Sequence, residues 1–295
     1  MIQDIPIIDS HQHFWQFNPI RDAWISDEMG VLRRDFMPEE LSNIYRGAGI
    51  AGCVAVQADQ SEDETLFLAD LASKYSFIKG VVGWTDLCSE RISEKLNEYQ
   101  ELSIVKGFRH IVQAENATEF LRREDFCRGI RELERQGFTY DLLIYARQLP
   151  AAHEFVACFP NLLFVVDHAA KPDISSIRAG ARPPYASSEN FARWKDEIVK
   201  LASYPNVYCK ISGLVTEADW ASWSKEDIIP FMDVLLSVFG AKRLMFGSDW
   251  PVCLLAAAEY NQVWLPVKQY LSALSVEEQA QIFHRTATEF YRLTL

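Results

Sequence analysis

Two histidines separated by a single residue stand near the start of the chain, in the segment DSHQH at residues 9–13. Side chains alternate along an extended backbone, so His11 and His13 point to the same side. Two neutral imidazoles on one side can chelate a divalent metal ion, or can donate two hydrogen bonds to one oxygen atom. Because so short a pattern also arises by chance, its meaning depends on what surrounds it.

His168 and Asp249 offer the same chemistry further along the chain. His168 follows an apolar run at residues 162–166, and Asp249 follows another at residues 244–246, in the sequence FGSDWP. A carboxylate on a stiff turn before a proline can be aimed, so Asp249 could be a metal ligand, a general base for water, or both. The competing interpretations are a histidine bonded to a backbone carbonyl and an aspartate on a surface turn.

Two cationic residues stand where they could bind a ligand. Arg109 follows a short apolar run, and its guanidinium fork suits substrate hydroxyls, a carboxylate or an oxyanion. Lys210 lies inside another apolar run, where a charged side chain is rare unless it is paired or has a function. Its side chain either points into the site or forms a buried ion pair with Asp249 or Asp167.

Three tryptophans stand at or just past the ends of apolar runs, namely Trp15, Trp84 and Trp250. Aromatic faces stack on the apolar faces of sugar rings, so these residues could bind a carbohydrate-like substrate. Packing in the core is the competing interpretation. The pattern leaves open whether His110 and Lys171 also contribute to the site.

The elements that must position these residues are short apolar runs alternating with helical segments. The runs span residues 5–8, 52–56, 78–82, 105–108, 140–144, 162–166, 207–211 and 244–246. Continuous apolar runs suit parallel strands buried on both faces. Capping boxes at Ser61 with Glu64 and at Ser275 with Glu278 mark helix starts between and after them. The alternation predicts an α/β fold, a single (β/α)8 TIM barrel that forms one domain over residues 1–295.

Three connections are longer than usual, at residues 14–36, 172–190 and 212–224. Each follows a predicted strand, on the face where barrel enzymes build their sites, and long loops on that face are often lids.

Composition excludes several classes of protein. The chain has 295 residues and a net charge of −12, which argues against nucleic acid as a partner. No apolar run approaches the roughly 18 residues of a membrane span, and the N-terminus lacks a secretory signal. The six scattered cysteines suggest reduced thiols rather than disulfides, so we expect a cytoplasmic protein. Apolar helix faces outside a barrel could support a homodimer.

Five segments together resemble the amidohydrolase superfamily: DSHQHFW, KGFRH, VVDHAAKP, KISGL and FGSDWP. The resemblance covers the whole chain. Within the amidohydrolase-related (amidohydrolase 2) family, the sequences of these five segments are similar to those of the sugar lactonase branch, which includes L-fuconolactonase and L-rhamnonolactonase. Pyrone-dicarboxylate and muconolactone-type hydrolases are relatives in the same branch. The motifs are specific to the family and do not fix the substrate.

The resemblance implies a hydrolase of carbohydrate metabolism that opens a small-molecule sugar lactone, of the L-fucono- or L-rhamnono-lactone type, to the aldonic acid. In that case Asp249 would take a proton from water while His11, His13 and His168 polarise the carbonyl. They would do so directly or through one divalent metal such as zinc, held by the three histidines and Asp249. Some members of the branch work without a metal.

A two-metal site is not expected, because the fourth run has no lysine at its tip and the fifth run has no histidine. Two other functions remain open. One is a metal-dependent decarboxylase of the same superfamily, and the other is a catalytically silent sugar-binding barrel.

Overall fold

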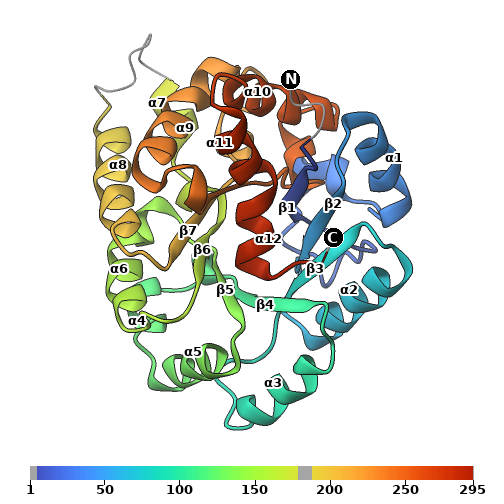
Figure 1. Cartoon of the computed structure of the whole chain (residues 1–295), viewed down its shortest axis with the longest axis vertical. Helices are drawn as coiled ribbons and strands as arrows, with labels where there is room; N and C mark the ends of the chain where they lie inside the picture. The colour runs from blue at the N-terminus through green and yellow to red at the C-terminus, as the bar shows by residue number, and fades with distance from the viewer. Residues whose placement is uncertain (1–4, 179–187, 295) are drawn as a thin grey trace.

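Eight parallel strands, paired in chain order from β1 to β8, form a barrel surrounded by helices (Figure 1). The computed structural model describes residues 5–178 and 188–294. The strands are β1 (Ile8–Gln12), β2 (Gly52–Val56), β3 (Ile78–Gly83), β4 (Val105–His110), β5 (Thr139–Leu142), β6 (Phe164–Val166), β7 (Val207–Ile211) and β8 (Leu244–Phe246). The predicted (β/α)8 barrel is confirmed, and one domain over residues 1–295 stays a prediction.

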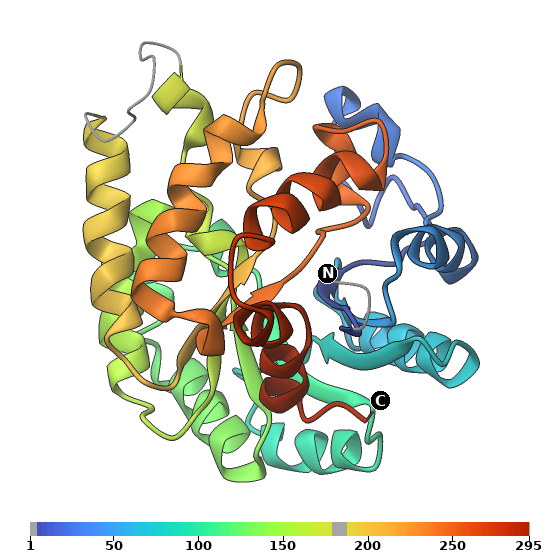
Figure 2. The ribbon, with the colours of Figure 1, turned by 45° about the horizontal axis from the view of Figure 1, so that its top comes forward.

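The helices pack around the outside of the strands (Figure 2). They are α1 (Pro38–Ala48), α2 (Glu62–Lys74), α3 (Ile92–Gln100), α4 (Ala117–Phe120), α5 (Glu124–Gln136), α6 (Leu149–Ala157), α7 (Ile174–Arg178), α8 (Glu189–Ala202), α9 (Lys225–Phe239), α10 (Tyr260–Leu271), α11 (Val276–Ala280) and α12 (Thr286–Tyr291). In α5, Phe126, Ile130 and Leu133 recur on one buried face, as amphipathic helices require. This helix ends at Gly137, whose φ of 77° glycine adopts without steric cost.

Hydrogen bonds between β1 and the segment after β8 close the barrel. The amide of Asp249 donates to the carbonyl of His11 at 2.8 Å, and the amide of His13 donates to the carbonyl of Trp250 at 2.7 Å. Ser10 Oγ donates to the carbonyl of Phe246 at 2.6 Å. The bonds that close the barrel therefore also bring Asp249 beside the two histidines of β1.

The first strand differs from the prediction. It was expected over residues 5–8 and instead spans Ile8–Gln12, so His11 lies inside the strand rather than after it. The predicted strand stopped at residue 8 because residues 9–12 are polar, and the end of an apolar run predicts the end of a buried strand.

Asp9 shows how a buried strand tolerates a carboxylate. Its oxygens accept hydrogen bonds from the Tyr45 hydroxyl at 2.8 Å, the Tyr260 hydroxyl at 3.0 Å and the Ser248 amide at 2.8 Å. Each lone pair that water would satisfy thus has a protein partner, which offsets the cost of burial. Asp9 also ties β1 to the segment that follows β8.

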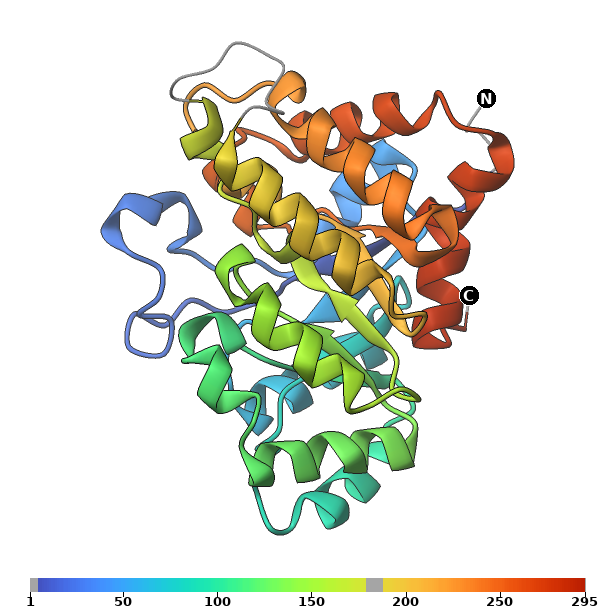
Figure 3. The ribbon, with the colours of Figure 1, turned by 90° about the vertical axis from the view of Figure 1, so that its left-hand side faces the viewer.

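The two ends of the barrel differ in character. The long connection after β1, at residues 14–36, extends on the side opposite α12, as Figure 3 shows. At the α12 end, Ala287, Phe290 and Tyr291 pack against interior residues of the strands such as Val54 and Met245. The C-terminal helix thus closes the end of the barrel away from the long loops. Residues 179–187 of the predicted connection 172–190 lie outside the described part of the chain.

No helix in the described residues is long and apolar enough to cross a membrane. All six cysteines lie within the described residues and are unpaired, three of them buried (Cys53, Cys209 and Cys253).

The helix start at Ser61 forms only half of the predicted capping box. Ser61 Oγ accepts from the Glu64 amide at 3.2 Å, but the Glu64 carboxylate accepts from the Ala58 amide at 3.1 Å instead of returning to Ser61. Burial raises the pKa of Glu64 to about 7. The box at Ser275 and Glu278 is complete.

Replacing Glu64 should therefore change the pH dependence of stability. The folded-state pKa of about 7 exceeds the ordinary value of 4.5, so the native protein binds more protons than the unfolded chain in that interval and loses stability as the pH rises through it. We expect Glu64→Gln to be more stable than the wild type by roughly 1–3 kcal/mol at pH 8 and equal at pH 4.5. Urea unfolding at both pH values checks this. A gain of similar size in Asp63→Asn, at an exposed position, would contradict it.

Two helical glycines should respond oppositely to alanine. A Cβ on Gly129 in α5 would collide with the backbone carbonyl of Leu87, whereas nothing lies within 4 Å of a Cβ on Gly47 in α1. Gly129→Ala should cost about 1–3 kcal/mol or more through overpacking. Gly47→Ala should add about 0.5–1 kcal/mol, since alanine forms helices better than glycine. Thermal unfolding compares them, and a stabilised Gly129→Ala would refute the close approach.

Candidate active site

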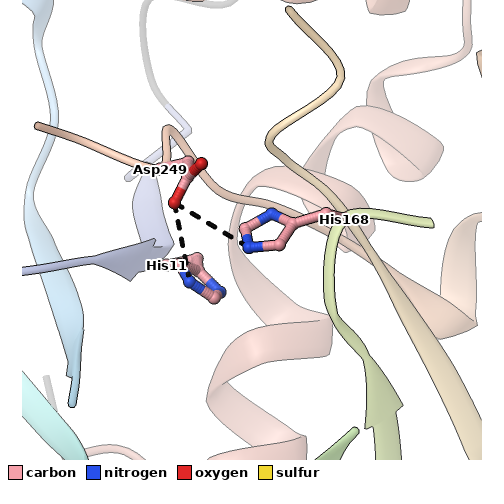
Figure 4. Close-up of side chains that lie close together, drawn as sticks. All are labelled: His11, His168 and Asp249. Atoms are coloured by element: carbon pink, nitrogen blue, oxygen red, sulfur yellow. Dashed lines mark ion pairs between the residues drawn. The ribbon is translucent and has the colours of Figure 1, made fainter. Parts of the chain in front are cut away.

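Three imidazoles surround one carboxylate oxygen at the mouth of the barrel. Oδ1 of Asp249 lies 3.4 Å from Nε2 of His13 and 3.8 Å from Nε2 of both His11 and His168. Figure 4 shows Asp249 facing His11 and His168 across the mouth. His11 belongs to β1, His168 follows β6 and Asp249 follows β8. All four predicted side chains thus converge, and all are buried.

His168 is held by an unusual backbone. Four successive residues adopt left-handed conformations: His168 (φ 52°), Ala169 (52°), Ala170 (59°) and Lys171 (47°). This conformation costs an L-residue of order 1–2 kcal/mol, so the surroundings must impose it. The indole of Trp194 does so in part, because it donates to the carbonyl of Ala169 at 2.8 Å.

Packing against the next strand fixes the ring of His168. Its Nδ1 lies 2.9 Å from the hydroxyl oxygen of Ser212. The following residue, Gly213, has a φ of 60°, and a Cβ there would collide with the imidazole. Glycine at this position lets the backbone after β7 approach the ring closely and hold its orientation.

The ionisation states suit both base and metal-ligand chemistry. Burial alone would raise the pKa of Asp249, but His168, His13 and His11 together hold it below its usual value. Burial lowers the pKa of His168 to about 4, against the opposing effect of Asp249 and Asp167. Burial also lowers the pKa of His11. Near neutral pH the site therefore presents an ionised Asp249 carboxylate beside the neutral rings of His11 and His168.

The donor set fits one metal ion. Nδ1 of His13 lies 2.7 Å from the carbonyl oxygen of Val56 and must donate to it, so in a neutral ring Nε2 would carry a lone pair. That lone pair faces Oδ1 of Asp249 at 3.4 Å, and two such acceptors repel unless a proton or a cation lies between them. One ligand atom each from His11, His168 and Asp249 lie within 4.8 Å of one another. Imidazole nitrogens with one carboxylate oxygen are ligands that zinc accepts.

A buried network of charges, which we call the charge network, lies beneath the histidines. Lys210 Nζ is 2.5 Å from Asp141 Oδ2, 3.0 Å from Asp167 Oδ1 and 3.2 Å from His11 Nδ1. Arg109 Nη1 is 2.9 Å from Asp167 Oδ2 and 3.3 Å from His11 Nε2. These cations neutralise the two carboxylates and fix the His11 ring from below.

The structure places Lys210 in the barrel interior rather than on the surface of the mouth. Of the two ion-pair partners considered, Asp167 is confirmed and Asp249 is wrong, because Lys210 lies beneath His11. Asp141 was missed. A charge inside an apolar run was the signal that singled out Lys210, and the same signal at position 141 would have found its partner. A substrate contact of Lys210 or Arg109 stays a prediction.

The three tryptophans have different surroundings. Trp15 and Trp250 are buried and pack against Phe36, each with ring centroids 5.3 Å away. Neither of these two rings faces solvent. Trp84 is half-buried, and its Nε1 lies 3.4 Å from Nδ1 of His110. His110 in turn pairs with Glu115 at 3.1 Å. Roles for the tryptophans in substrate binding stay predictions.

A cavity of about 800 Å³ lies at the same end of the barrel, between the loops after β5, β6 and β7. Lys171 lines it, together with Tyr145, Glu217 and Trp220. The sequence pattern left Lys171 open and gave no signal for Tyr145 or Glu217, because loop residues carry no periodicity.

Removing the central cation should destabilise the protein. Lys210→Met leaves Asp141 buried without its cation and Asp167 with Arg109 alone, and breaking a buried pair typically costs 3–5 kcal/mol. The double variant Lys210→Met/Asp141→Asn should regain part of that loss. Lys200→Met is the matched control, since Lys200 is 62% exposed in its pair with Glu197, and a pair at the surface is worth at most about 1 kcal/mol. Chemical unfolding measures all three, and a loss in Lys210→Met no larger than the control would contradict the charge network.

The fold and the site together define a (β/α)8-barrel enzyme whose histidines and aspartate converge from separate strand ends. The chain belongs to the amidohydrolase family, whose sequence pattern matches residues 8–293. The membership predicted from the five motifs is confirmed.

Relatives of this chain carry informative names. L-fucono-1,5-lactonase of Burkholderia multivorans is 39% identical over 292 residues, covering 97% of this chain and 96% of that protein. The protein of the same name from Burkholderia ambifaria is 32% identical over 293 residues, covering 97% and 95%. A solved structure of an amidohydrolase from Burkholderia multivorans with bound zinc is 38% identical, covers 98% of this chain and 100% of its own, and has a TM-score of 0.91.

Proposed function

We propose that the protein is a lactonase that opens a sugar lactone, of the L-fucono- or L-rhamnono-lactone type, to its aldonic acid. The observation that carries this proposal is an ionised carboxylate within 4 Å of three imidazole nitrogens, at the mouth of a barrel. Support comes from the two relatives named L-fucono-1,5-lactonase, which are 39% and 32% identical.

In the proposed mechanism, Asp249 accepts a proton from a water molecule as that water attacks the lactone carbonyl carbon. The ester bond to the ring oxygen then breaks, and the ring oxygen leaves as a hydroxyl group that takes the proton back. Each turnover thus consumes one lactone and one water and releases one hydroxy acid. His11, His13 and His168 face the position where negative charge develops on the carbonyl oxygen.

A single divalent ion such as zinc would be held by His11, His13, His168 and Asp249. When bound, it would polarise the carbonyl and lower the pKa of water. Without an ion, the same imidazoles can donate hydrogen bonds only as protonated or Nε2–H forms. The charge network keeps His11 in place in either case.

We further infer that the enzyme acts in the cytoplasm on a small-molecule substrate. Six unpaired cysteines support this location, because secreted proteins commonly pair theirs.

The experiment is a panel of aldonolactones assayed by acid release, with and without a chelator, on wild type and Asp249→Asn. Loss of the general base should lower kcat/KM by about 10²–10⁴-fold. Asp27→Asn, whose side chain is 97% exposed, is the control and should match the wild type. Metal content measured on the purified protein, with activity after chelation, separates the metal-dependent and metal-free forms of the mechanism.

Three results would overturn the proposal. Unchanged turnover in Asp249→Asn would show that Asp249 is not the general base. Carbon dioxide release from a dienoic or aromatic acid would indicate a decarboxylase instead. Calorimetric binding of lactones with no turnover would indicate a silent sugar-binding barrel.

A further inference from the structure

The cavity beside the site contains a pair of opposite charges that the proposed mechanism does not use. Lys171 ends the left-handed turn that begins at His168, and Glu217 ends the 3-10 turn Val215–Glu217 after β7. Both side chains line the cavity of about 800 Å³. Each is 19% exposed, so both are partly withdrawn from solvent while still reachable.

The pair is open. Lys171 Nζ and Glu217 Oε1 are 3.8 Å apart, which is too long for a hydrogen bond. Among the residues that the structure describes, neither group has a hydrogen-bond partner within 3.5 Å. Apart from their mutual ion pair, the described residues give the ammonium protons and the carboxylate lone pairs no hydrogen bond, so both groups can bind a ligand. Polar groups that lack hydrogen bonds in a partly buried cavity do not stabilise the fold, since burial costs them their hydration. Such groups are suited to binding a ligand instead.

Tyr145 and Trp220 contribute aromatic rings to a wall that is otherwise largely polar, with Arg147, Asp173 and Arg193 also lining it. The guanidinium of Arg147 lies 4.4 Å from the centroid of the Tyr145 ring, and Lys171 Nζ lies 5.7 Å from it. Trp220, which is 37% exposed, borders the other side. Aromatic faces next to paired hydrogen-bonding groups suit a ring with one apolar face and several hydroxyls.

The cavity adjoins the reacting centre. Lys171 is three residues from His168 in a continuous turn, and its charge is among those that lower the pKa of His168, after burial. Burial raises the pKa of Glu217, and the charge of Asp249 adds to that effect. None of the four converging residues lines the cavity, so a ligand held at Asp249 would have to extend past the turn at His168 to reach Lys171 and Glu217.

We propose that Lys171 and Glu217 form the hydroxyl-recognition subsite of the lactone site, in which Lys171 donates to one ring hydroxyl and Glu217 accepts from its neighbour. The pair then selects polyhydroxylated lactones over unsubstituted lactones of the same ring size. This inference rests on the proposed lactonase function. It concerns which lactone is used, and the bond-breaking step belongs to Asp249.

The test compares L-fucono-1,5-lactone with δ-valerolactone, which has a six-membered ring and no hydroxyls. Lys171→Met and Glu217→Gln are measured beside Lys74→Met and Asp70→Asn, which disrupt an exposed ion pair on α2. A lost hydrogen bond to a charged group should lower kcat/KM for the sugar lactone about 10- to 100-fold, mainly through KM. Turnover of δ-valerolactone should change less than about threefold, and the α2 controls should leave both lactones unaffected.

Thermal unfolding of each variant separates a binding defect from a folding defect. The subsite is overturned if the ratio of kcat/KM for the two lactones stays at its wild-type value, whether both values fall equally or neither changes. If the wild type opens no lactone, the proposed function fails, and calorimetry with L-fuconate then decides the subsite alone. In that assay, Glu217→Gln and Lys171→Met should each weaken binding about tenfold or more, and binding equal to wild type would overturn the inference.

Discussion

A lysine buried between two aspartates is the interaction on which the site depends. Lys210 is fully buried, and it contacts Asp141, Asp167 and His11 at once. Charges of this kind are costly to remove from water, and only close, mutual compensation makes them tolerable. Tyr291 extends the compensation from the far end of the barrel, because its hydroxyl lies 2.8 Å from Oδ2 of Asp141. The active centre is thereby supported from beneath by buried charges and by the Tyr291 hydroxyl.

The backbone at the mouth of the barrel is strained, unlike the closely compensated charge network beneath it. The four left-handed residues from His168 to Lys171 would not persist in an isolated peptide. The Trp194 hydrogen bond to the Ala169 carbonyl helps to hold this backbone, and the close approach of Gly213 confines the His168 ring. The surrounding packing offsets the free-energy cost of this backbone, and it holds the His168 imidazole facing Asp249.

Much of this arrangement could be predicted because it depends on local patterns. Apolar runs and helix signals recur with the period of a barrel, and the chemistry-bearing residues His11, His13, His168 and Asp249 stand at or near strand ends. Convergence then follows from topology, since the carboxyl ends of parallel strands share one face of a barrel.

The remainder depends on contacts that no local pattern records. β1 extends through polar residues because Tyr45 and Tyr260 satisfy Asp9, and both partners are far away in the sequence. Glu64 bonds the Ala58 amide rather than closing a capping box, because the chain turns back over the helix start. Glu217 reaches the cavity through an irregular loop whose path is set by its neighbours, so its position is visible only in three dimensions.

The closure of the barrel also sets the order in which the protein can become active during synthesis. His11 is made long before Asp249, and the backbone bond between them joins β1 to the segment after β8. Tyr291, which steadies Asp141, is made later still. A nascent chain on the ribosome therefore cannot form this centre until the segment after β8 has emerged. Contacts between such distant parts of a sequence raise the contact order, which generally slows folding.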